Sequence, residues 1–397
     1  MSARRHIVRA AIASAAVLLL AAVVAGCTAD LRAPVTVFSY QIPGTGIATD
    51  TPRPASRTTA APKATPVPLE PVVPGTHSGS ALRARLSDAS SARFRVVSRT
   101  ITTQTATVTQ SFRFQGRKQT ITFKVPRADL RWSDGRELRI RVSDTESHED
   151  RISQFWRSVV SEPHQTSTYE ALSKSFRSIR AAQQLDDNEY AELMTAWVQQ
   201  MPYDDAEAKS GASNRYPVVT AVKGTGVCGD KSVLLAGLLA HEGYKVALFE
   251  FEGESHMSVG LGTTTKGYRE TGYAFLETTG PGLIGEVGAA YGPDGSITLR
   301  SRPILVTIST TGTRYSAGKD VTWIVGRRRA YEKVYASLAG TIEEARSNLD
   351  RYDGSAVARF NEKVGRVNRA ASTINTVQDH PDDREALKAY LEMRGEP

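Results

Sequence analysis

The chain has 397 residues, enough for one sizeable core with accessory parts, and its apolar fraction of 40% is typical of a globular protein. The formal charge is +8 at pH 7, but lysine and arginine form no dense tract in the body of the chain. We therefore expect no nucleic-acid partner. A mildly basic surface suits solubility, an anionic wall polymer or lipid head groups.

The N-terminal segment 1–26 has the layout of a signal peptide. Three arginines lie within the first nine residues, and an apolar run spans 10–25. The sequence Val-Ala-Gly-Cys at 24–27 resembles a bacterial-type lipobox. This resemblance implies cleavage before Cys27 and lipidation of Cys27, which would anchor the protein to the outer side of a cell membrane. An uncleaved signal anchor is the alternative, and it also places the rest of the chain outside the cytoplasm.

Residues 27–80 are expected to form the lipidated anchor and a stalk. Nine of the eighteen prolines lie within 31–80, and such a composition buries no core and favours extended polyproline conformations. The chain has only two cysteines. If Cys27 carries lipid, Cys228 has no intramolecular disulfide partner, so it is either a buried inert thiol or a reactive one.

An N-terminal β region is predicted for 81–135. Alternation of polar and apolar residues indicates strands at 94–97, 106–108, 111–114 and 120–125. The sequence Gln-Gly-Arg at 115–117 is typical of a hairpin turn between two of them.

A mostly helical stretch is predicted for 148–202, with an interruption at Pro163. Ser167, with a glutamate three residues later, has the spacing of a capping box. Asp186 or Asp187 is expected to cap a second helix, in which apolar residues recur every three or four positions.

The segment 136–300 is predicted to form the main folded domain. A glycine-bearing turn at 224–226 precedes an apolar helix, which Cys228 opens and which ends near Gly243. Three strands are predicted to follow, at 246–251, 256–261 and 273–278.

The last segment, 301–397, is predicted to contain strands at 304–308 and 321–325, followed by a helical hairpin. Apolar residues step mostly by three and four from Val334 to Leu349 and again from Val357 to Ile374. We expect the two helices to pack on the core or on each other. Docking of a protein partner on these helices is the alternative.

Cys228 combines with two later residues into a predicted site. A thiol attacks as its thiolate, and the unpaired N–H groups at a helix start favour that charge and stabilise an oxyanion. His256 begins a strand whose other face is apolar, so its ring is expected to face the helix end as a base. Glu277, inside the next apolar strand, needs a polar partner, and His256 supplies one. His241 is a rival base, but it lies one helix length from Cys228.

Together these residues resemble the transglutaminase-like superfamily. The matching elements are the upstream segment 197–203, GVCGD at 226–230, Gly-Tyr at 243–244, His256 and Glu-Thr-Thr at 277–279. The resemblance covers about 110–295 and implies an α+β, papain-like core, in which the cysteine opens a helix packed on an antiparallel sheet. Glu277 replaces the aspartate of many members, and Val227 and Gly229 stand where some members have acids.

By position, the resemblance implies that Cys228 is the nucleophile, His256 the base and Glu277 the residue that orients it. The predicted reaction is acyl transfer from an amide through a thioester. Water as acceptor gives a cysteine hydrolase acting on a protein or peptide, which we favour, and an amine gives a cross-linking transglutaminase. A non-enzymatic binding or structural lipoprotein that keeps the fold is the remaining alternative. Gln199, or its neighbour Gln200, is a candidate oxyanion donor, and an amide on the helix surface is the competing interpretation.

No cofactor and no metal are predicted. The pair Asp204-Asp205 is interpreted as part of a solvated loop, with cation binding as the alternative. The expected partners are membrane lipid through acylated Cys27, a protein or peptide substrate, and a protein at the C-terminal helices.

Overall fold

The computed structural model describes residues 94–138, 146–210, 214–288, 290–292 and 295–397. The predicted signal peptide 1–26, the lipidation site Cys27 and the stalk 27–80 lie outside the described residues. Within the described ranges, no helix has both the length and the hydrophobicity needed to cross a bilayer. The described chain belongs to the mixed α+β class with antiparallel sheets, as predicted.

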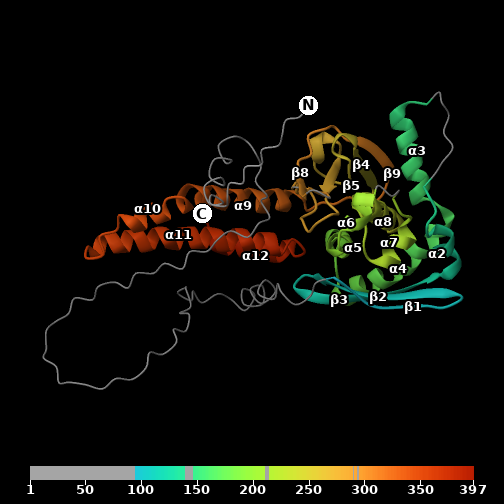
Figure 1. Cartoon of the computed structure of the whole chain (residues 1–397), viewed down its shortest axis with the longest axis horizontal. Helices are drawn as coiled ribbons and strands as arrows, with labels where there is room; N and C mark the ends of the chain where they lie inside the picture. The colour runs from blue at the N-terminus through green and yellow to red at the C-terminus, as the bar shows by residue number, and fades with distance from the viewer. Residues whose placement is uncertain (1–93, 139–145, 211–213, 289, 293–294) are drawn as a thin grey trace, which may run out of the picture.

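The first sheet has three antiparallel strands in sequence order: β1 (Arg95–Ile101), β2 (Thr105–Phe114) and β3 (Arg117–Pro126). The turn between β2 and β3 has positive φ at Gln115 (49°) and Gly116 (66°), a backbone that matches the twist of a tight hairpin. The predicted hairpin is thereby confirmed. Alternate residues of β3 are buried, and α4 (Pro163–Gln183) lies across this sheet (Figure 1).

Four helices follow: α2 (Arg127–Ser133), α3 (His148–Val160), α4 and α5 (Asp187–Gln200). The predicted break is found at Pro163, the first residue of α4, where a missing N–H costs no intrahelical bond. Asp186 caps α5 in a capping box with Glu189. The capping box predicted at Ser167 is wrong, because α4 begins four residues earlier and the Ser167 hydroxyl donates instead to Asp129 at 2.6 Å.

The centre of the molecule is a helix packed on a four-stranded antiparallel sheet. The central helix is α8 (Cys228–His241), and two short helices precede it, α6 (Asp205–Ser210) and α7 (Pro217–Lys223). The strands lie in the order β6–β5–β4–β9, namely β6 (Tyr273–Leu276), β5 (His256–Gly262), β4 (Val246–Phe251) and β9 (Ile304–Ser309). Short 3₁₀ turns at Glu252–Glu254 and Tyr268–Glu270, and a small hairpin of β7 (Ala290–Gly292) and β8 (Gly295–Ile297), complete this region.

The two faces of this sheet pack against different partners. Leu248 and Val259 belong to the main core, which includes the leucines of α8. Phe249 and Phe275 lie in a separate aromatic cluster on the other face. The predicted boundary at residue 300 therefore falls within the main domain, because β9 pairs with β4 along its length.

The C-terminal part is helical: α9 (Gly318–Ala339), α10 (Ile342–Ser347), α11 (Gly354–Asp379) and α12 (Arg384–Arg394). The strand predicted at 321–325 is wrong, since this segment lies inside α9. Its buried residues are spaced as one face of a helix: Val321, Ile324, Val325, Arg328 and Tyr331.

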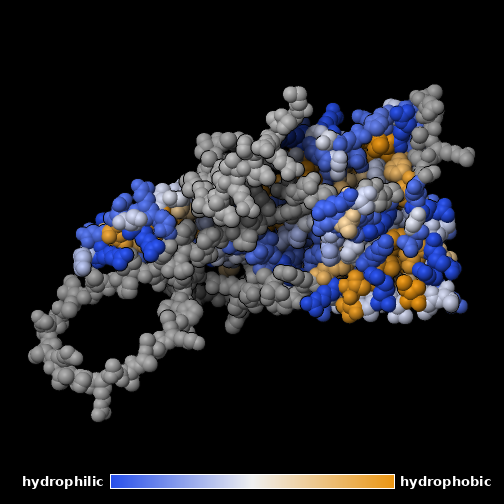
Figure 2. Space-filling view, viewed as in Figure 1, coloured by the Kyte–Doolittle hydropathy of each residue, from blue (hydrophilic) through white to orange (hydrophobic). Residues whose placement is uncertain are grey.

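The predicted helical hairpin is present, and it projects from the body of the molecule (Figure 1). Ile342 and Phe360 contribute to a small apolar cluster between its helices, and the surface of its far end is largely hydrophilic in Figure 2. Buried ion pairs fix the near end to the body. Arg384 on α12 binds Glu192 at 2.7 Å, and Asp382 binds Arg113 on β2 at 2.7 Å.

Candidate active site

Cys228 is the first residue of α8, as predicted, and its side chain is partly exposed. Asp230 holds this helix start in place. Its carboxylate accepts hydrogen bonds from the backbone N–H of Val227 (3.2 Å) and of Arg215 (2.6 Å). A side chain at position 226 would meet the Asp230 Cβ at 2.8 Å, so the turn needs Gly226. The N–H groups of the first turn of α8, which begins at Cys228, have no acceptor within the helix.

His256 is the first residue of β5, and its side chain is buried. Phe251 lies opposite it in the antiparallel register of β4 and β5. The preceding residue, Ser255, has a positive φ of 48° and places its carbonyl oxygen 4.0 Å from the Cys228 sulfur. The turn before β5 therefore brings the start of the strand to the start of α8.

Glu277 lies directly after β6 rather than inside it, and it is also buried. Its Oε1 accepts hydrogen bonds from the Thr278 N–H (2.9 Å), the Thr279 N–H (2.8 Å) and the Thr279 hydroxyl (2.7 Å). Its Oε2 lies 3.1 Å from His256 Nε2. Burial opposes ionisation, but His256 and the Thr279 hydrogen bonds hold the pKa of Glu277 below its ordinary value.

The carboxylate of Glu277 determines which nitrogen of the His256 ring carries a proton. Because an ionised carboxylate only accepts hydrogen bonds, Nε2 must donate, and this leaves Nδ1 as the atom free to take a proton. Nδ1 forms no hydrogen bond of ordinary geometry with any described residue. Burial lowers the pKa of His256, but the neighbouring Glu277 and Cys228 outweigh it and raise the pKa to about 10. Cys228, His256 and Glu277 therefore lie together, and they favour a charged imidazolium.

The structure does not support Gln199 as an oxyanion donor. Its side-chain nitrogen donates to the Glu277 carbonyl (2.8 Å) and the Gly282 carbonyl (3.0 Å), so both of its protons are used. Its oxygen accepts from the Gly282 N–H at 3.2 Å. The surface interpretation is also wrong, because Gln199 is buried. Gln200, its neighbour, instead bonds the backbone of Arg113 on β2. The N–H groups at the start of α8 remain the candidate oxyanion donors.

Three residues around this site were not predicted from the sequence to belong to it. The Ser232 hydroxyl lies 3.1 Å from the Met257 carbonyl oxygen and 2.9 Å from the Thr278 hydroxyl. Lys231 is fully buried beside it. Tyr203 forms a β-bridge with Gly226, two residues before Cys228, and burial raises the pKa of Tyr203, with Cys228 adding to this effect. The available signal was a lysine and a serine at the head of an otherwise apolar helix.

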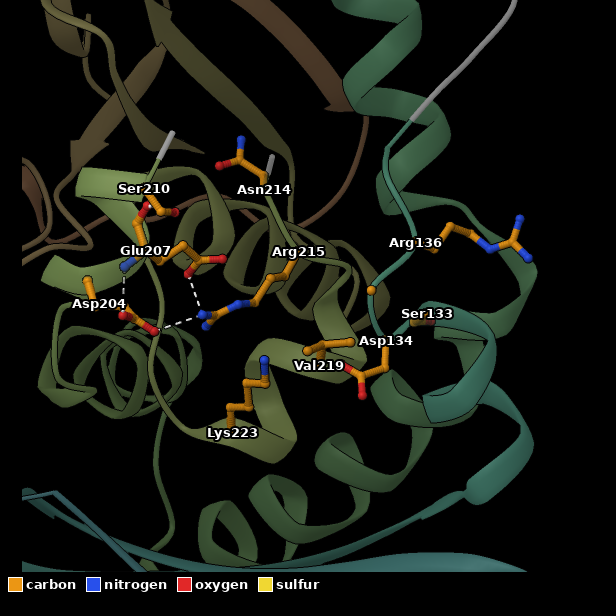
Figure 3. Close-up of a pocket in the computed structure, with 12 residues that line it drawn as sticks. Ser133, Asp134, Arg136, Asp204, Glu207, Ser210, Asn214, Arg215, Val219 and Lys223 are labelled. Carbon is orange, nitrogen blue, oxygen red and sulfur yellow. Dashed lines mark hydrogen bonds and ion pairs between the residues drawn. The ribbon is translucent and has the colours of Figure 1, made fainter. Parts of the chain in front are cut away.

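A pocket of about 530 Å³ is lined by residues of α2, α6 and α7 and of the segments beside these helices (Figure 3). The side chain of Asn214, which lines it, lies against Gly229, where a Cβ would meet the Asn214 Nδ2 at 2.5 Å. Figure 3 shows Arg215 between Asp204 and Glu207, at 2.7 Å and 2.6 Å. The remaining lining residues are Ser133, Asp134, Gly135, Arg136, Ala206, Ser210, Val219 and Lys223.

Asp204 is thus engaged with a cation of the protein itself, which argues against a metal ion bound by this aspartate pair. Among the residues that the structure describes, no group of three histidine, cysteine or acidic side chains is arranged to hold a metal.

Comparisons with protein-family models, with curated proteins and with solved structures found no match to this chain. Function is therefore inferred from the geometry of the site.

Proposed function

We propose that this protein is a cysteine hydrolase with a transglutaminase-like, papain-like core, which cleaves amide bonds through a thioester. One observation carries the proposal. The buried Glu277 carboxylate fixes the His256 ring so that its Nδ1 is the proton-accepting atom, next to a thiol at a helix start. A buried, charged pair of this kind has no evident packing role, because apolar residues of similar volume cost less.

The residues suggest a two-stage reaction. The raised pKa of His256 favours a resting pair in which Nδ1 already holds the Cys228 proton, and the thiolate attacks the amide carbonyl carbon to form a tetrahedral oxyanion. The N–H groups at the start of α8 stabilise this oxyanion. His256 returns the proton to the leaving amine as the C–N bond breaks, which leaves a thioester on Cys228. Water then loses a proton to His256 and attacks the thioester, and the acid leaves as the proton returns to the sulfur.

The acceptor decides between hydrolysis and cross-linking. Cys228 is partly exposed, and Asn214, which lines the pocket, lies against the next residue, Gly229, so a thioester on Cys228 would be open to water. This favours hydrolysis. A primary amine that occupied the pocket first would give the transglutaminase reaction instead.

We further propose that the enzyme acts outside the cytoplasm on a protein or peptide, anchored by lipid on Cys27. A substrate-bearing partner would bind along the projecting hairpin of α9 and α11. The side chain of Tyr352, between α10 and α11, is 95% exposed and offers an aromatic contact at the far end.

The test uses the full-length chain with a casein-like donor and a labelled primary amine. A hydrolase releases amide-derived amine and incorporates little label, and the Cys228→Ala variant does neither. His256→Ala should lower the rate by at least about a hundredfold, as expected for loss of a general base. His241→Ala, at the far end of the same helix, is the matched control and should retain activity. Amine incorporation that depends on Cys228 would establish the transglutaminase instead. Turnover that is unchanged in Cys228→Ala, or absent in every chain, would refute the enzyme.

A further inference from the structure

Lys231 lies one helical turn after Cys228, and its ammonium group is enclosed by the protein. It is 0% exposed, and among the residues that the structure describes it is the only fully buried lysine. Its Nζ donates to the carbonyl oxygens of Met201 (2.9 Å) and Gln199 (3.3 Å). Both carbonyls belong to the C-terminal end of α5, where unpaired oxygens and the helix dipole attract a cation.

This position is costly for a lysine. An ammonium ion loses its hydration on burial, and a carboxylate in contact usually compensates for that loss. No described carboxylate lies within ion-pair distance of the Lys231 Nζ. The ionisable groups that influence its charge are Glu277, after β6, and Cys228, on its own helix. A methionine of similar length would satisfy the packing without the electrostatic cost.

Lys231 is also connected to Glu277 through Gln199. The Lys231 Nζ binds the backbone carbonyl of Gln199, and the Gln199 side chain binds the backbone of Glu277 and of Gly282. The end of α5, the start of α8 and the segment after β6 are thus joined by one set of hydrogen bonds. Movement of Lys231 would be transmitted to the carboxylate that orients His256.

On the basis of the proposed function, we propose that Lys231 is a positioning residue of the site, which stabilises the Cys228 thiolate by its charge and holds Glu277 in register with His256. Electrostatic coupling is reciprocal: if the anions favour the charged lysine, the charged lysine favours the anions by the same amount. Burial lowers the pKa of Lys231 to about 7, against the opposing effects of Glu277 and Cys228. The support it gives the thiolate is therefore largest below neutral pH and declines above it.

The test is the pH dependence of Cys228 alkylation by iodoacetamide, from pH 5 to pH 9, in the full-length chain. In Lys231→Met, the rate at pH 6 should fall about tenfold, because less of the thiol is ionised without the neighbouring positive charge. The difference should shrink above pH 8, where Lys231 is already neutral in the parent protein. Lys209→Met, an exposed lysine on α6, is the matched control and should not change the profile. A folded Lys231→Met whose profile superposes on that of the parent would overturn the proposal.

A second measurement requires no variant of Lys231 itself. The ammonium group of Lys231 is titrated by ¹⁵N NMR in the parent chain and in Cys228→Ala. Removal of the thiolate should lower the titration midpoint of Lys231, and an unchanged midpoint would refute the coupling even if Lys231→Met failed to fold. Failure of the proposed function has a different signature: Cys228 in the parent chain would then label only after unfolding, or with the profile of an ordinary thiol near pH 8.5.

Discussion

Glu277→Gln removes the negative charge that faces His256 while it keeps the shape of the side chain. In the parent chain, three donors converge on Oε1, and Nε2 of His256 donates to Oε2. The glutamine oxygen must occupy the Oε1 position, because those three donors need an acceptor. Its amide nitrogen then faces His256 and donates to Nε2. The neutral ring is forced to carry its proton on Nδ1, where it cannot accept the proton of Cys228.

The structure gives the size of this effect. The pKa of His256 rises from 6.5 to about 10, which corresponds to about 5 kcal/mol in favour of the charged ring. Glu277 and Cys228 share this preference. We therefore assign about 3 kcal/mol to Glu277, in line with the cost of breaking a buried ion pair. The titration midpoint of His256 should fall by about two units in Glu277→Gln.

The sign of the pH dependence follows from the two shifts. A histidine with a raised pKa stabilises the fold fully below pH 6.5, and this contribution is lost as the pH rises through about 10. A glutamate with a lowered pKa stabilises the fold above pH 4.5, and its contribution is lost as the pH falls. Glu277→Gln should therefore lower the free energy of unfolding most between pH 4.5 and pH 6.5. Urea unfolding at pH 5.5 should show a loss of about 3 kcal/mol, which shrinks to about 1 kcal/mol at pH 9.5.

The assay for the site itself combines NMR titration of His256 with iodoacetamide labelling of Cys228. In Glu277→Gln, labelling at pH 7 should slow by about 10- to 100-fold, and the His256 midpoint should move toward its ordinary range. Cys228→Ala removes the thiol and keeps Glu277, so it separates the effects of these two groups on the pKa of His256. An unchanged His256 midpoint in Glu277→Gln would show that the carboxylate does not control the ring, and the assignment of the triad would then be wrong.

Two further changes test the surroundings and the location of the site. Gln199→Leu leaves the carbonyls of Glu277 and Gly282 without their donor. It should therefore lower the free energy of unfolding by about 2–4 kcal/mol in a urea titration. A variant of full stability with a reduced kcat would instead support Gln199 as an oxyanion donor. Cys27→Ser, expressed as the full-length chain, should move from the detergent phase to the aqueous phase on partitioning, and retention in the detergent phase would indicate an uncleaved signal anchor instead.

The order of elements made the site predictable. Because a helix that Cys228 opens is followed by two neighbouring strands, the topology brings the first residue of the helix near the ends of both strands. The period-two pattern of β5 placed His256 off the apolar face, and the need of a buried carboxylate for a partner linked Glu277 to it. These local rules act over short segments, so they can be read from one sequence.

The support around the site depends on packing between distant segments, which periodicity does not reveal. The sequence left Gln199 as either an oxyanion donor or a surface amide, because the segment that covers it comes 78 residues later. The mistake at 321–325 has a related cause. The β-branched residues there favour a strand by composition, yet Val321, Ile324 and Val325 join the main core as one buried face of a helix.

The position of Glu277 just beyond β6 has a physical consequence that its predicted place inside a strand would not allow. If the strand continued, one of the next two N–H groups would be used by the neighbouring strand β5, because β6 lies at the edge of the sheet. Because β6 ends at Leu276, the N–H groups of Thr278 and Thr279 turn back to the carboxylate and hold its Oε1. The second oxygen is then left to a single partner, His256. A carboxylate held this firmly keeps its place beside His256, and it stays ionised despite its burial. The end of the strand is therefore what allows this buried glutamate to stay ionised beside His256.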